Sequence, residues 1–481
     1  MYLNEYITYE MFGAVGDGVH NDMPAIAAAH EEANRLHLPV RAKEGADYYI
    51  SPKAVTARVM TDTCWEGAKF TIDDRDCEDI KAPVFLVESS LSPVALPVKT
   101  LAKGQTVIEN PHGCDLYVLV KNSEQKDFIR FGLNQDNGSD RTDAFIVRAD
   151  GTLGSPVAYD FEKITELTAC PINETTLHIT GGEFLTIANQ AESRYNYHSR
   201  NIEIRRSNVD IGHIRHDVTG ETDHGAPYRG FISVCSCANV TVHDMVFTAH
   251  FIYVTIGSAG LPVKMGSYDI NVDSAVNITF RRCTQTTDIH DDRYWGLIGS
   301  NYCRDLLFED CTMSRFDAHK GVTNCTIRRC NLGWQGLNAI GHGLLTVEDT
   351  SICGRALVSL RPDYGGLWDG DMILKNCVWK PAGENRVLFE AKNDGHHYFG
   401  FDCCFPHNIT VDGLTVAEDT VSDAPLYLFS DYLGEEPVPV EERKHLPEET
   451  KTVCLRNIHT LRPVKLCSNA ELFKNTVLIS E

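Results

Sequence analysis

The sequence has no apolar run that approaches the roughly 20 residues of a membrane-spanning helix. Its first residues, Met1 to Glu5, also lack the basic segment and the apolar stretch of a secretory signal. We therefore expect no membrane partner, and we expect a protein that is cytoplasmic or has had a signal removed.

Positive charge is scarce, because 44 Lys and Arg residues oppose 67 Asp and Glu residues and the formal net charge is −23. Binding to nucleic acid or anionic lipid depends on Lys and Arg that neutralise phosphate, so this balance argues against both partners. An anionic sugar remains compatible with a local basic patch. The hydrophobic content of 43% and the charged content of 23% are ordinary for a folded soluble protein.

Metal and nucleotide motifs are missing as well. The 17 cysteines are an odd number for a disulfide framework, and they form no C-x-x-C pair of the zinc-binding type. The pair His396-His397 lies near Asp402 but lacks a third spaced ligand, so we interpret it as a polar loop. No P-loop signature is present. We predict neither a metal nor a cofactor, and we expect most cysteines to be small buried hydrophobic residues.

Helical stripes of period 3.6 and hairpin signals are also rare, whereas one short β-rich pattern recurs along the chain. Each copy begins with Asn or Asp and has a small or apolar residue six positions later, as in Asn239–Met245 and Asn277–Cys283. Further copies are Asp305–Cys311, Asn324–Cys330 and Asp371–Cys377, with weaker ones at 201–207, 344–350, 408–414 and 452–458.

The spacing of these copies predicts the fold class. From Met245 to Leu414 the sixth-position residues follow one another at intervals of 19 to 38 residues. The shortest intervals equal one bare coil of three short strands, and the longer ones are coils with loops. A solenoid also accommodates 481 residues in one body, because each coil buries its own slice of core. We predict an all-β, right-handed parallel β-helix from roughly residue 40 to residue 470.

One helix is expected at the N-terminus. Asn21 and Asp22 precede Met23-Pro24 and an Ala-rich run, which is typical of an N-cap followed by a helix over 22–36. We expect it to cover the first coil, with residues 1–40 as a cap and 41–481 as the β-helix with loop insertions. Residues 51–200 are predicted to add early coils plus insertions such as 134–140, and 434–449 to form an exposed loop.

The N-terminal residues carry a family resemblance. Phe12 to Gly18, then Asn21-Asp22, the Ala-rich helix and Tyr48-Tyr49-Ile50 resemble the N-terminal signature of the pectate-lyase-like superfamily. That superfamily includes polygalacturonases, phage tail-spike depolymerases and polysaccharide lyases. The resemblance implies a β-helix that acts on carbohydrate, and it is weak for the activity because these enzymes differ in chemistry on one scaffold.

Aligning the coils by the repeat predicts a ladder of polar side chains. Side chains alternate along a strand and neighbouring coils lie about 4.8 Å apart, so five coils give a ladder roughly 20 Å long. Its predicted outward members are Asp288, His290, Asp317, His319, Asn338, Arg361, Glu390 and Lys392. Ile289, Phe316 or Ala318, Leu337, Leu360 and Ala391 are predicted to point inward. The aromatic residues expected to flank the ladder are Tyr294, Trp295, Tyr302, Trp334, Tyr364 and Trp368, and tryptophans there are candidates for stacking on sugar rings.

A glycoside hydrolase is the first functional hypothesis, because such enzymes use two carboxyls. Asp317 lies in the middle of the ladder, with Asp291 and Asp292 predicted one coil before it, and His319 two residues on. These four residues are the catalytic candidates. Arg361, Asn338, His290, His342, Asp363 and the tryptophans Trp295, Trp334 and Trp368 are the substrate-binding candidates.

Polygalacturonase-like enzymes carry an Asp-Asp pair, a Gly-His-Gly and an Arg-containing motif in that order. The sequence is similar in having Asp291-Asp292, then Gly341-His342-Gly343, then Arg361. It departs from that pattern in having Pro362-Asp363 after the Arg and in lacking an Asn-Thr-Asp motif ahead of the pair.

Two alternatives remain open. A polysaccharide lyase would use His319 or Lys320 as base, with Arg361 and Arg315 to neutralise a uronate carboxyl. A tail-spike-like protein would bind glycan without cleaving it. Asp217 and Glu221 are candidates for the groove on an earlier coil, and Asp369 for a more distant carboxyl. The expected partner is an oligosaccharide or polysaccharide, and the sequence is compatible with a homo-oligomer.

Overall fold

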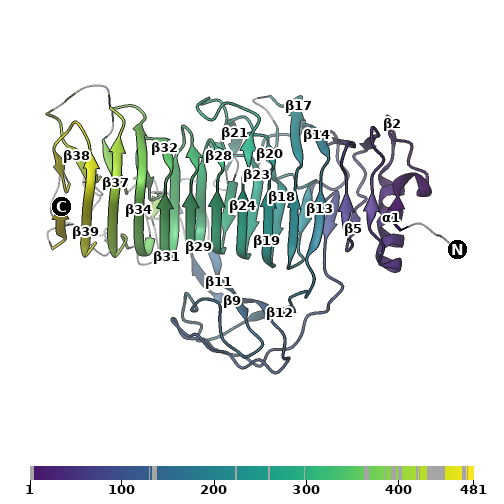
Figure 1. The fold of residues 1–481 in the computed structure, drawn as a ribbon, viewed down its shortest axis with the longest axis horizontal. Helices are drawn as coiled ribbons and strands as arrows, with labels where there is room; N and C mark the ends of the chain where they lie inside the picture. The colour runs from purple at the N-terminus through teal and green to yellow at the C-terminus, as the bar shows by residue number, and fades with distance from the viewer. Residues whose placement is uncertain are drawn as a thin grey trace.

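The structure is a computed structural model. It describes residues 5–128, 131–132, 138–194, 196–222, 225–257, 260–296, 298–361, 368–384, 386–391, 397–398, 404–418, 421, 423–430, 450–467, 473 and 475–480. The chain forms a right-handed parallel β-helix, as predicted, with α1 (Met23–Leu36) at one end and the C-terminus at the other (Figure 1). Within these ranges, no helix combines the length and the apolar character needed to cross a membrane.

Each coil runs through three parallel sheets, which we number in the order in which a coil visits them. Sheet 1 consists of β5 (Ala57–Val59), β8 (Phe85–Val87), β15 (Ile202–Ile204), β18 (Arg229–Cys235), β23 (Tyr268–Asp273), β26 (Ile298–Asn301), the first residues of β29 (Phe316–Arg328) and of β31 (Leu337–Glu348), β33 (Ala356–Ser359), β35 (Val387–Glu390), β38 (Leu426–Phe429) and β40 (Val464–Lys465).

Sheet 2 continues each coil. It consists of β1 (Ile7–Thr8), β3 (Val40–Arg41), β6 (Thr63–Cys64), β13 (Leu177–Thr180), β16 (Val209–Gly212), β19 (Ala238–His243), β24 (Val276–Arg281), β27 (Arg304–Glu309), the later residues of β29 and β31, the first residues of β34 (Trp368–Pro381), β37 (Asn408–Val416) and β39 (Thr452–His459), and β41 (Val477–Ser480).

Sheet 3 closes each coil. It consists of β2 (Asp17–Asn21), β4 (Asp47–Ile50), β7 (Lys69–Asp73), β14 (Glu183–Ile187), β17 (Arg215–Thr219), β20 (Val246–Phe247), β25 (Thr284–Gln285), β28 (Thr312–Met313), β30 (Asn331–Leu332), β32 (Ser351–Gly354) and the ends of β34, β37 and β39. The apolar side chains of all three sheets fill one continuous core.

The repeat found in the sequence is the strand of sheet 2 with a bend at each end. Its first residue is left-handed in Asn239, Asn277 and Asn324, with φ of 57°, 57° and 56°. The residue before its sixth-position Cys is left-handed too, with φ of 52° in Arg282 and 55° in Asp310. Asn and Asp tolerate this conformation better than most residues, which explains their recurrence. The sixth-position cysteines Cys283, Cys311, Cys330 and Cys377 are buried, as expected.

The helix α1 lies over the first coil and buries Met23, Ile26 and Ala33 against it. Asp22 is its N-cap residue, but the Asp22 carboxylate accepts hydrogen bonds from the N–H groups of Val15 and Gly16 instead of from the helix. The cap therefore ties the preceding loop to the helix start. The short 3₁₀ helix η1 (Tyr9–Phe12) packs beside it.

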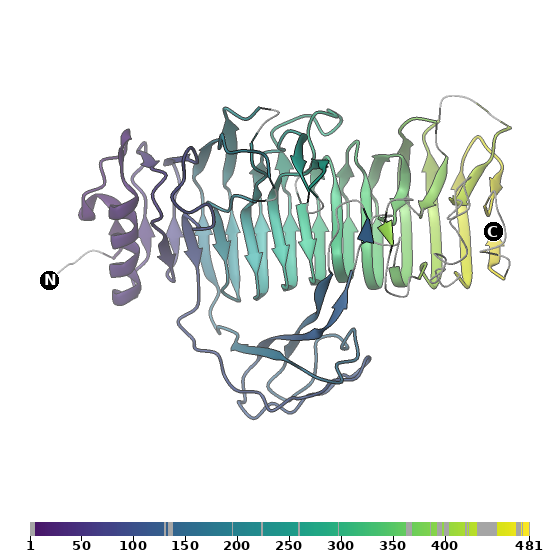
Figure 2. The same cartoon turned by 180° about the vertical axis from the view of Figure 1, so that it is seen from behind.

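Residues 88–176 form a unit that projects from one side of the β-helix, which we call the insert (Figures 1 and 2). Its antiparallel sheet contains β12 (Glu166–Pro171), β9 (Leu116–Asp127) and β11 (Ser139–Val147), and it has its own core around Val118, Phe145 and Phe161. The sequence predicted early coils plus insertions over 51–200. The strands from β5 to β8, and then β13 and β14, do belong to early coils, but the insertion is the whole of 88–176 and not a short loop such as 134–140.

Two small antiparallel pairs complete the fold. β21 (Tyr253–Ile256) pairs with β22 (Pro262–Met265) between β20 and β23. β10 (Phe131–Gly132) pairs with β36 (His397–Tyr398), so the insert also contacts a loop of the later coils. The predicted loop 434–449 lies outside the described residues.

Candidate functional site

The predicted ladder lies on sheet 1, but its register differs from the prediction. Asp317 pairs with Asn338, Asn338 pairs with Ser359, and Ser359 pairs with Glu390. Ser359 therefore occupies the ladder position that was predicted for Arg361, and Arg361 lies two residues after it. The alignment failed because the turn that joins sheet 3 to sheet 1 differs in length from coil to coil. Arg355 alone separates β32 from β33, whereas residues 333–336 separate β30 from β31. Arg361 nevertheless reaches back to Asp317.

The prediction that Asp317 faces solvent is wrong. Its side chain is fully buried, and its Oδ2 atom lies 2.7 Å from Arg361 Nη1 and 2.9 Å from Arg315 Nη2. The Arg315 guanidinium in turn lies over the ring of Trp295, 4.6 Å from its centroid. Asp317, Arg315 and Arg361 thus form a structural ion cluster in this conformation. The catalytic role of Asp317 stays a prediction.

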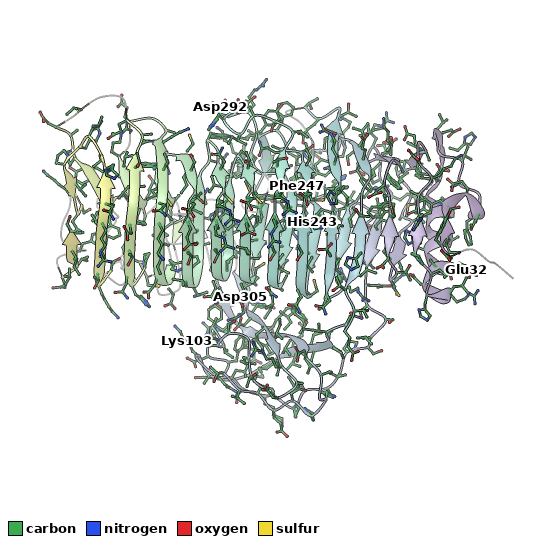
Figure 3. The ribbon with its side chains drawn as sticks, in the orientation of Figure 1. Glu32, Lys103, His243, Phe247, Asp292 and Asp305 are labelled. Atoms are coloured by element: carbon green, nitrogen blue, oxygen red, sulfur yellow. The ribbon has the colours of Figure 1, made fainter. Side chains whose placement is uncertain are left out.

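The acidic residues expected one coil earlier do not lie beside Asp317. Ser300 pairs with Ala318, so the small residue Gly299 is the neighbour of Asp317 on the preceding strand. Asp288, His290, Asp291 and Asp292 belong to the loop between β25 and β26, where Asp291 forms an ion pair with Arg293 at 2.5 Å. His290 is exposed, and Asp292 lies at the upper edge of the molecule in Figure 3. The predicted carboxylate pair is therefore not formed.

The remaining members of the ladder make local contacts. His319 Nδ1 lies 2.8 Å from Asn301 Oδ1, and Asn338 Nδ2 donates to the carbonyl of Gln335 at 2.9 Å. Lys320 donates to Ser139 of the insert. Glu390, expected outward, is buried and forms an ion pair with Arg355. On the ladder, Asp317 and Glu390 are thus buried, whereas His319 and Asn338 are partly exposed.

The tryptophans hold the structure together. Trp368 is fully buried and donates from Nε1 to the Gly343 carbonyl, which contradicts its predicted place at a binding surface. Trp334 is half-buried and donates to the Tyr294 carbonyl at 3.1 Å. Trp295 packs against Gly266 so closely that a Cβ atom there would collide with the indole. Tyr302 packs against Phe128 of the insert.

His342 does not join the Asp317 cluster. It belongs to sheet 2 and contacts the insert, where its Nε2 atom pairs with the Tyr159 hydroxyl. Its register partner on the next coil, Asp369, forms an ion pair with Lys103 at 2.9 Å. His342, followed by Lys103, holds the pKa of Asp369 well below its usual range. Asp363, Tyr364, Lys392, His396 and Asp402 lie outside the described residues.

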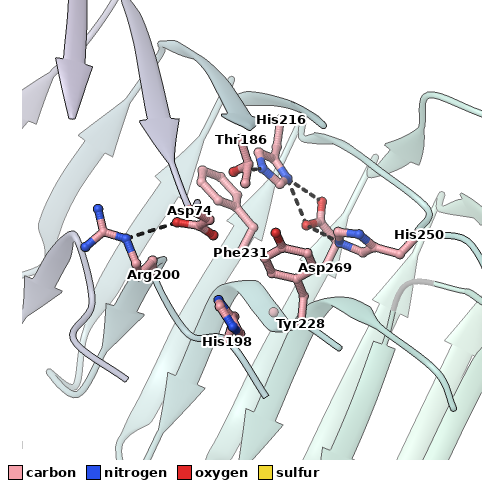
Figure 4. A pocket seen from close by; sticks show the side chains of 10 residues that line it. Asp74, Thr186, His198, Arg200, His216, Tyr228, Phe231, His250 and Asp269 are labelled. Carbon is pink, nitrogen blue, oxygen red and sulfur yellow. Dashed lines mark hydrogen bonds and ion pairs between the residues drawn. The ribbon is translucent and has the colours of Figure 1, made fainter. Parts of the chain in front are cut away.

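A buried polar cluster lies at the corner between sheets 3 and 1 (Figure 4). Asp269 accepts from His216 Nδ1 at 2.8 Å and lies 3.5 Å from His250 Nε2, while His250 Nδ1 lies 2.8 Å from Glu221. Burial lowers the pKa of His250, but the carboxylates of Glu221 and Asp269 outweigh it and raise that pKa to about 10. His250 is therefore a cation between two carboxylates.

This cluster does not form a site for a sugar. The cavity among its side chains measures about 10 Å³, which is room for about one water molecule. Glu221, which the sequence analysis proposed for the groove, instead forms an ion pair with His250 in this cluster. The second candidate, Asp217, forms an ion pair with Arg215 at 2.6 Å on the surface. The cluster holds the corner of the coil together.

A larger hollow lies on the outer face of sheet 2, and sequence reasoning missed it. This groove of about 390 Å³ crosses β13, β16, β19 and β24. Its lining consists of Thr176, His178, Asn208, Val209, Asp210, Asn239, Thr241, Asn277 and Thr279. Asp210, Thr241 and Thr279 are register partners on successive coils, so they form one row across the groove floor.

The asparagines form a second row along the groove. Asn239 Nδ2 donates to Asn208 Oδ1 at 3.0 Å, and Asn277 Nδ2 donates to Asn239 Oδ1 at 2.7 Å. Each left-handed bend thus repeats one amide per coil at a fixed orientation. The sequence signal for this surface was the repeat itself, because its first and third residues are the asparagines and threonines of the groove.

Charged groups gather at one side of the groove. Asp210 Oδ1 lies 3.1 Å from His243 Nε2 and 3.7 Å from His178 Nδ1. His243 Nδ1 lies 2.7 Å from Asp244, which Arg282 also binds with two hydrogen bonds. His243, which is labelled in Figure 3, is thus oriented by a second carboxylate while its other nitrogen faces Asp210.

Neither family models nor curated proteins match the sequence. Among solved structures, the tailspike protein gp49 from Pseudomonas phage LKA1 is similar at a TM-score of 0.54 and 13% identity, over 98% of this chain and 84% of that chain. The tailspike gp61 of Pseudomonas phage phi297 has a TM-score of 0.53 and 12% identity, over 95% and 81%. The Gp54 tailspike of Acinetobacter baumannii bacteriophage AP22, solved in complex with A. baumannii capsular saccharide, has a TM-score of 0.51 and 9% identity, over 98% and 79%. At these identities the likeness shows a shared fold.

Proposed function

We propose that the protein binds a polysaccharide in the groove on the outer face of sheet 2. The observation that carries this proposal is the lining, in which eight of nine residues offer amide, hydroxyl, imidazole or carboxylate groups in rows that repeat from coil to coil. Four strands about 4.8 Å apart span about 14 Å, which suits a short run of sugar rings. A repeating glycan and a repeating protein surface match one another in period.

The relatives in fold support a saccharide as the ligand, since the AP22 tailspike was solved with a capsular saccharide. The lining adds a preference among saccharides. None of its nine described residues is Lys or Arg, Asp210 carries a carboxylate there, and the whole chain has a net charge of −23. A polyanionic glycan would be repelled, so we expect a neutral polysaccharide or one with amino groups.

Cleavage of the bound glycan is a second candidate function, favoured by Asp210. This carboxylate is 37% exposed and faces two imidazoles, those of His178 and His243. Glycosidic hydrolysis needs one group that donates a proton and one that accepts a proton, and such a cluster offers both. Of the earlier hypotheses, hydrolysis by Asp317 requires this buried carboxyl to become accessible, whereas His319 and Lys320, the proposed bases of a lyase, are partly exposed.

The binding proposal is tested by filling the groove. Thr241→Trp places an indole on the groove floor, and Thr346→Trp is the matched control, because Thr346 has the same register position four coils further along sheet 2. Binding to a panel of neutral and anionic polysaccharides is measured by affinity electrophoresis. We expect Thr241→Trp to weaken binding at least about tenfold, which is about 1.4 kcal/mol. Equal binding by both variants would contradict the proposal.

Cleavage has its own readout. Reducing ends released from the best-binding polysaccharide are measured for the unaltered protein, Asp210→Asn and Asp317→Asn. Loss of release in Asp210→Asn at unchanged binding supports the second function at the groove. Loss only in Asp317→Asn, with retained thermal stability, would return the chemistry to sheet 1.

A further inference from the structure

A second group of side chains gathers far along the β-helix, where sheet 1 turns into sheet 2 beneath the insert. His342 on β31 and Asp369 on β34 are direct register partners, so their side chains leave adjacent strands side by side. Cys404 and His407 precede β37, on the coil after that. One donor from each of Asp369, Cys404 and His407 lies within 4.8 Å of the others.

The segment that carries Cys404 and His407 is held in place from three directions. The N–H of Trp368 donates to the Cys404 carbonyl at 3.0 Å, and the N–H of His407 donates to the Gly370 carbonyl at 2.6 Å. Between them, Phe405 is buried in the core of the β-helix. Cys404 and His407 are therefore presented toward Asp369 by a fixed backbone.

The distances suit donors that share one ion. Bond lengths of about 2.0–2.3 Å place two ligands of a tetrahedral zinc ion about 3.3–3.8 Å apart. His407 Nε2 lies 3.3 Å from Asp369 Oδ1, within that range. His342 Nδ1 lies 3.8 Å from the other oxygen, Oδ2, and outside the group of three mutually close donors, so His342 is a neighbour of the site and not a ligand in it.

We propose that Cys404, His407 and Asp369 form a binding site for a divalent transition metal of the zinc class. One thiolate, one imidazole and one carboxylate, with water in the fourth position, are a donor set that suits tetrahedral zinc. The spacing Cys404-Phe-Pro-His407 is the C-x-x-H analogue of the C-x-x-C pairs that the sequence lacks. On binding, the Cys404 thiol releases its proton to water, and His407 binds as a neutral imidazole.

The surroundings place the site beside the insert. Lys103 of the insert contacts Asp369 Oδ2, which leaves Oδ1 for the ion (Figure 3 labels Lys103 on the side of the insert nearest the later coils). Asp369 belongs to β34, and Cys404 and His407 belong to the next coil, so the ion joins two coils of the β-helix. This is a structural role. This inference does not depend on the proposed glycan binding.

The other His and Asp cluster of possible ligands in the described chain is weaker. It consists of His213, His243 and Asp244, but both oxygens of Asp244 are already bound by Arg282. A metal there would have to displace an arginine.

The test is a titration of the chelator-treated, reduced full-length protein with Co²⁺ alone, followed by absorption. We expect one ion per chain, a thiolate-to-cobalt charge-transfer band and the intense visible bands of tetrahedral Co²⁺. Cys404→Ser should lose the charge-transfer band, and His407→Gln should weaken binding at least tenfold. Cys353→Ser is the matched control, since Cys353 is a half-buried thiol on β32 outside both clusters, and it should keep the full spectrum.

Stability supplies a second measurement in case a variant folds poorly. Zn²⁺ should raise the melting temperature of the unaltered protein and of Cys353→Ser, and it should leave that of Cys404→Ser unchanged. A protein that binds no Co²⁺ at micromolar concentration would overturn the proposal. So would a charge-transfer band that survives in Cys404→Ser.

Discussion

At the residue scale, Asp317 is an anion held by two cations inside the protein. Arg315 and Arg361 both reach its Oδ2 atom, and Trp295 covers Arg315. Such an arrangement contributes little net stability when intact, but removing one partner leaves a buried charge without compensation. The residue that the sequence placed at the centre of a catalytic ladder therefore has a clear structural duty.

Asp317→Asn should destabilise the protein, because the amide cannot neutralise Arg315 and Arg361. We expect a loss of about 3–5 kcal/mol in the free energy of unfolding, measured by urea denaturation. Asp292→Asn is the control, since Asp292 is exposed in a loop, and should change that free energy by less than about 0.5 kcal/mol. Equal stability of the two variants would show that the ion cluster has no structural role.

His250 gives a prediction for pH. Its pKa in the folded protein is about 10 against 6.5 for the free residue, so it binds its proton more tightly when folded. Its stabilising contribution is therefore fully present below pH 6.5 and is lost as the pH rises from 6.5 to about 10. The difference in unfolding free energy between the unaltered protein and His250→Gln should shrink over that range.

The groups that face His250 set the controls for this experiment. Glu221 and Asp269 are its two carboxylate neighbours, and Tyr228 stacks on its ring. The pKa of Asp269 is lowered to about 2, so its own contribution is lost on the acid side, as the pH falls from 3.8 toward 2. His290→Gln, at an exposed histidine, should show no such trend. A constant difference for His250→Gln between pH 6 and 10 would contradict the assigned charge.

How far the sequence predicts individual residues depends on which strand carries them. Alternation correctly placed Ala318, Leu337 and Leu360 inward, because the strand period is fixed. It failed for Asp317 and Glu390, because burial of an outward face depends on loops and on the insert, which follow no period. Arg361 contacts Asp317 because its side chain is long enough to reach that carboxylate, although the two residues are not register partners.

At the scale of elements, sheet 2 was predictable and its neighbours were not. Its strands are flanked by left-handed bends that favour Asn or Asp, and a buried Cys follows in several coils, so these coils carry a local signature. The turns before sheet 1 vary in length and carry no such sequence signature. The insert was invisible for the same reason, since 88–176 has an ordinary antiparallel sheet that belongs to no repeat.

The insert is fastened to the β-helix by Arg304, which yields a prediction about the junction. This buried side chain donates to the carbonyls of Ala144 and Pro156 and to the carboxylate of Asp143. Arg304→Ala leaves Asp143 buried without its cation, at a cost of about 3–5 kcal/mol. Limited proteolysis should then cut within 88–176 at lower protease concentrations than in the unaltered protein.

A surface arginine is the control for that junction. Arg281 pairs with Glu309 on sheet 2 and is 42% exposed, so Arg281→Ala should cost no more than about 1 kcal/mol. Its cleavage pattern should match that of the unaltered protein. If Arg304→Ala resists protease equally well, the insert is held by its apolar contacts, chiefly those of Tyr117 with Ala238 and Val276.

At the scale of the whole molecule, a parallel β-helix repeats its surface as well as its core. The same repeat that reveals the fold in the sequence places polar side chains of successive coils in rows across the groove, such as Asn208, Asn239 and Asn277. The fold was therefore predictable from the repeat. The groove was not, because its place along the helix depends on where covering loops are absent. Glycan binding by that repeated surface is the central claim.

The most direct test is a crystal structure of the protein with an oligosaccharide cut from the polysaccharide that it binds best. The account predicts sugar rings across β13, β16, β19 and β24, over Thr241 and Thr279, with hydroxyls bonded to Asn239 and Asp210. Sugar bound over sheet 1 or on the insert, with the sheet 2 groove left open, would contradict it.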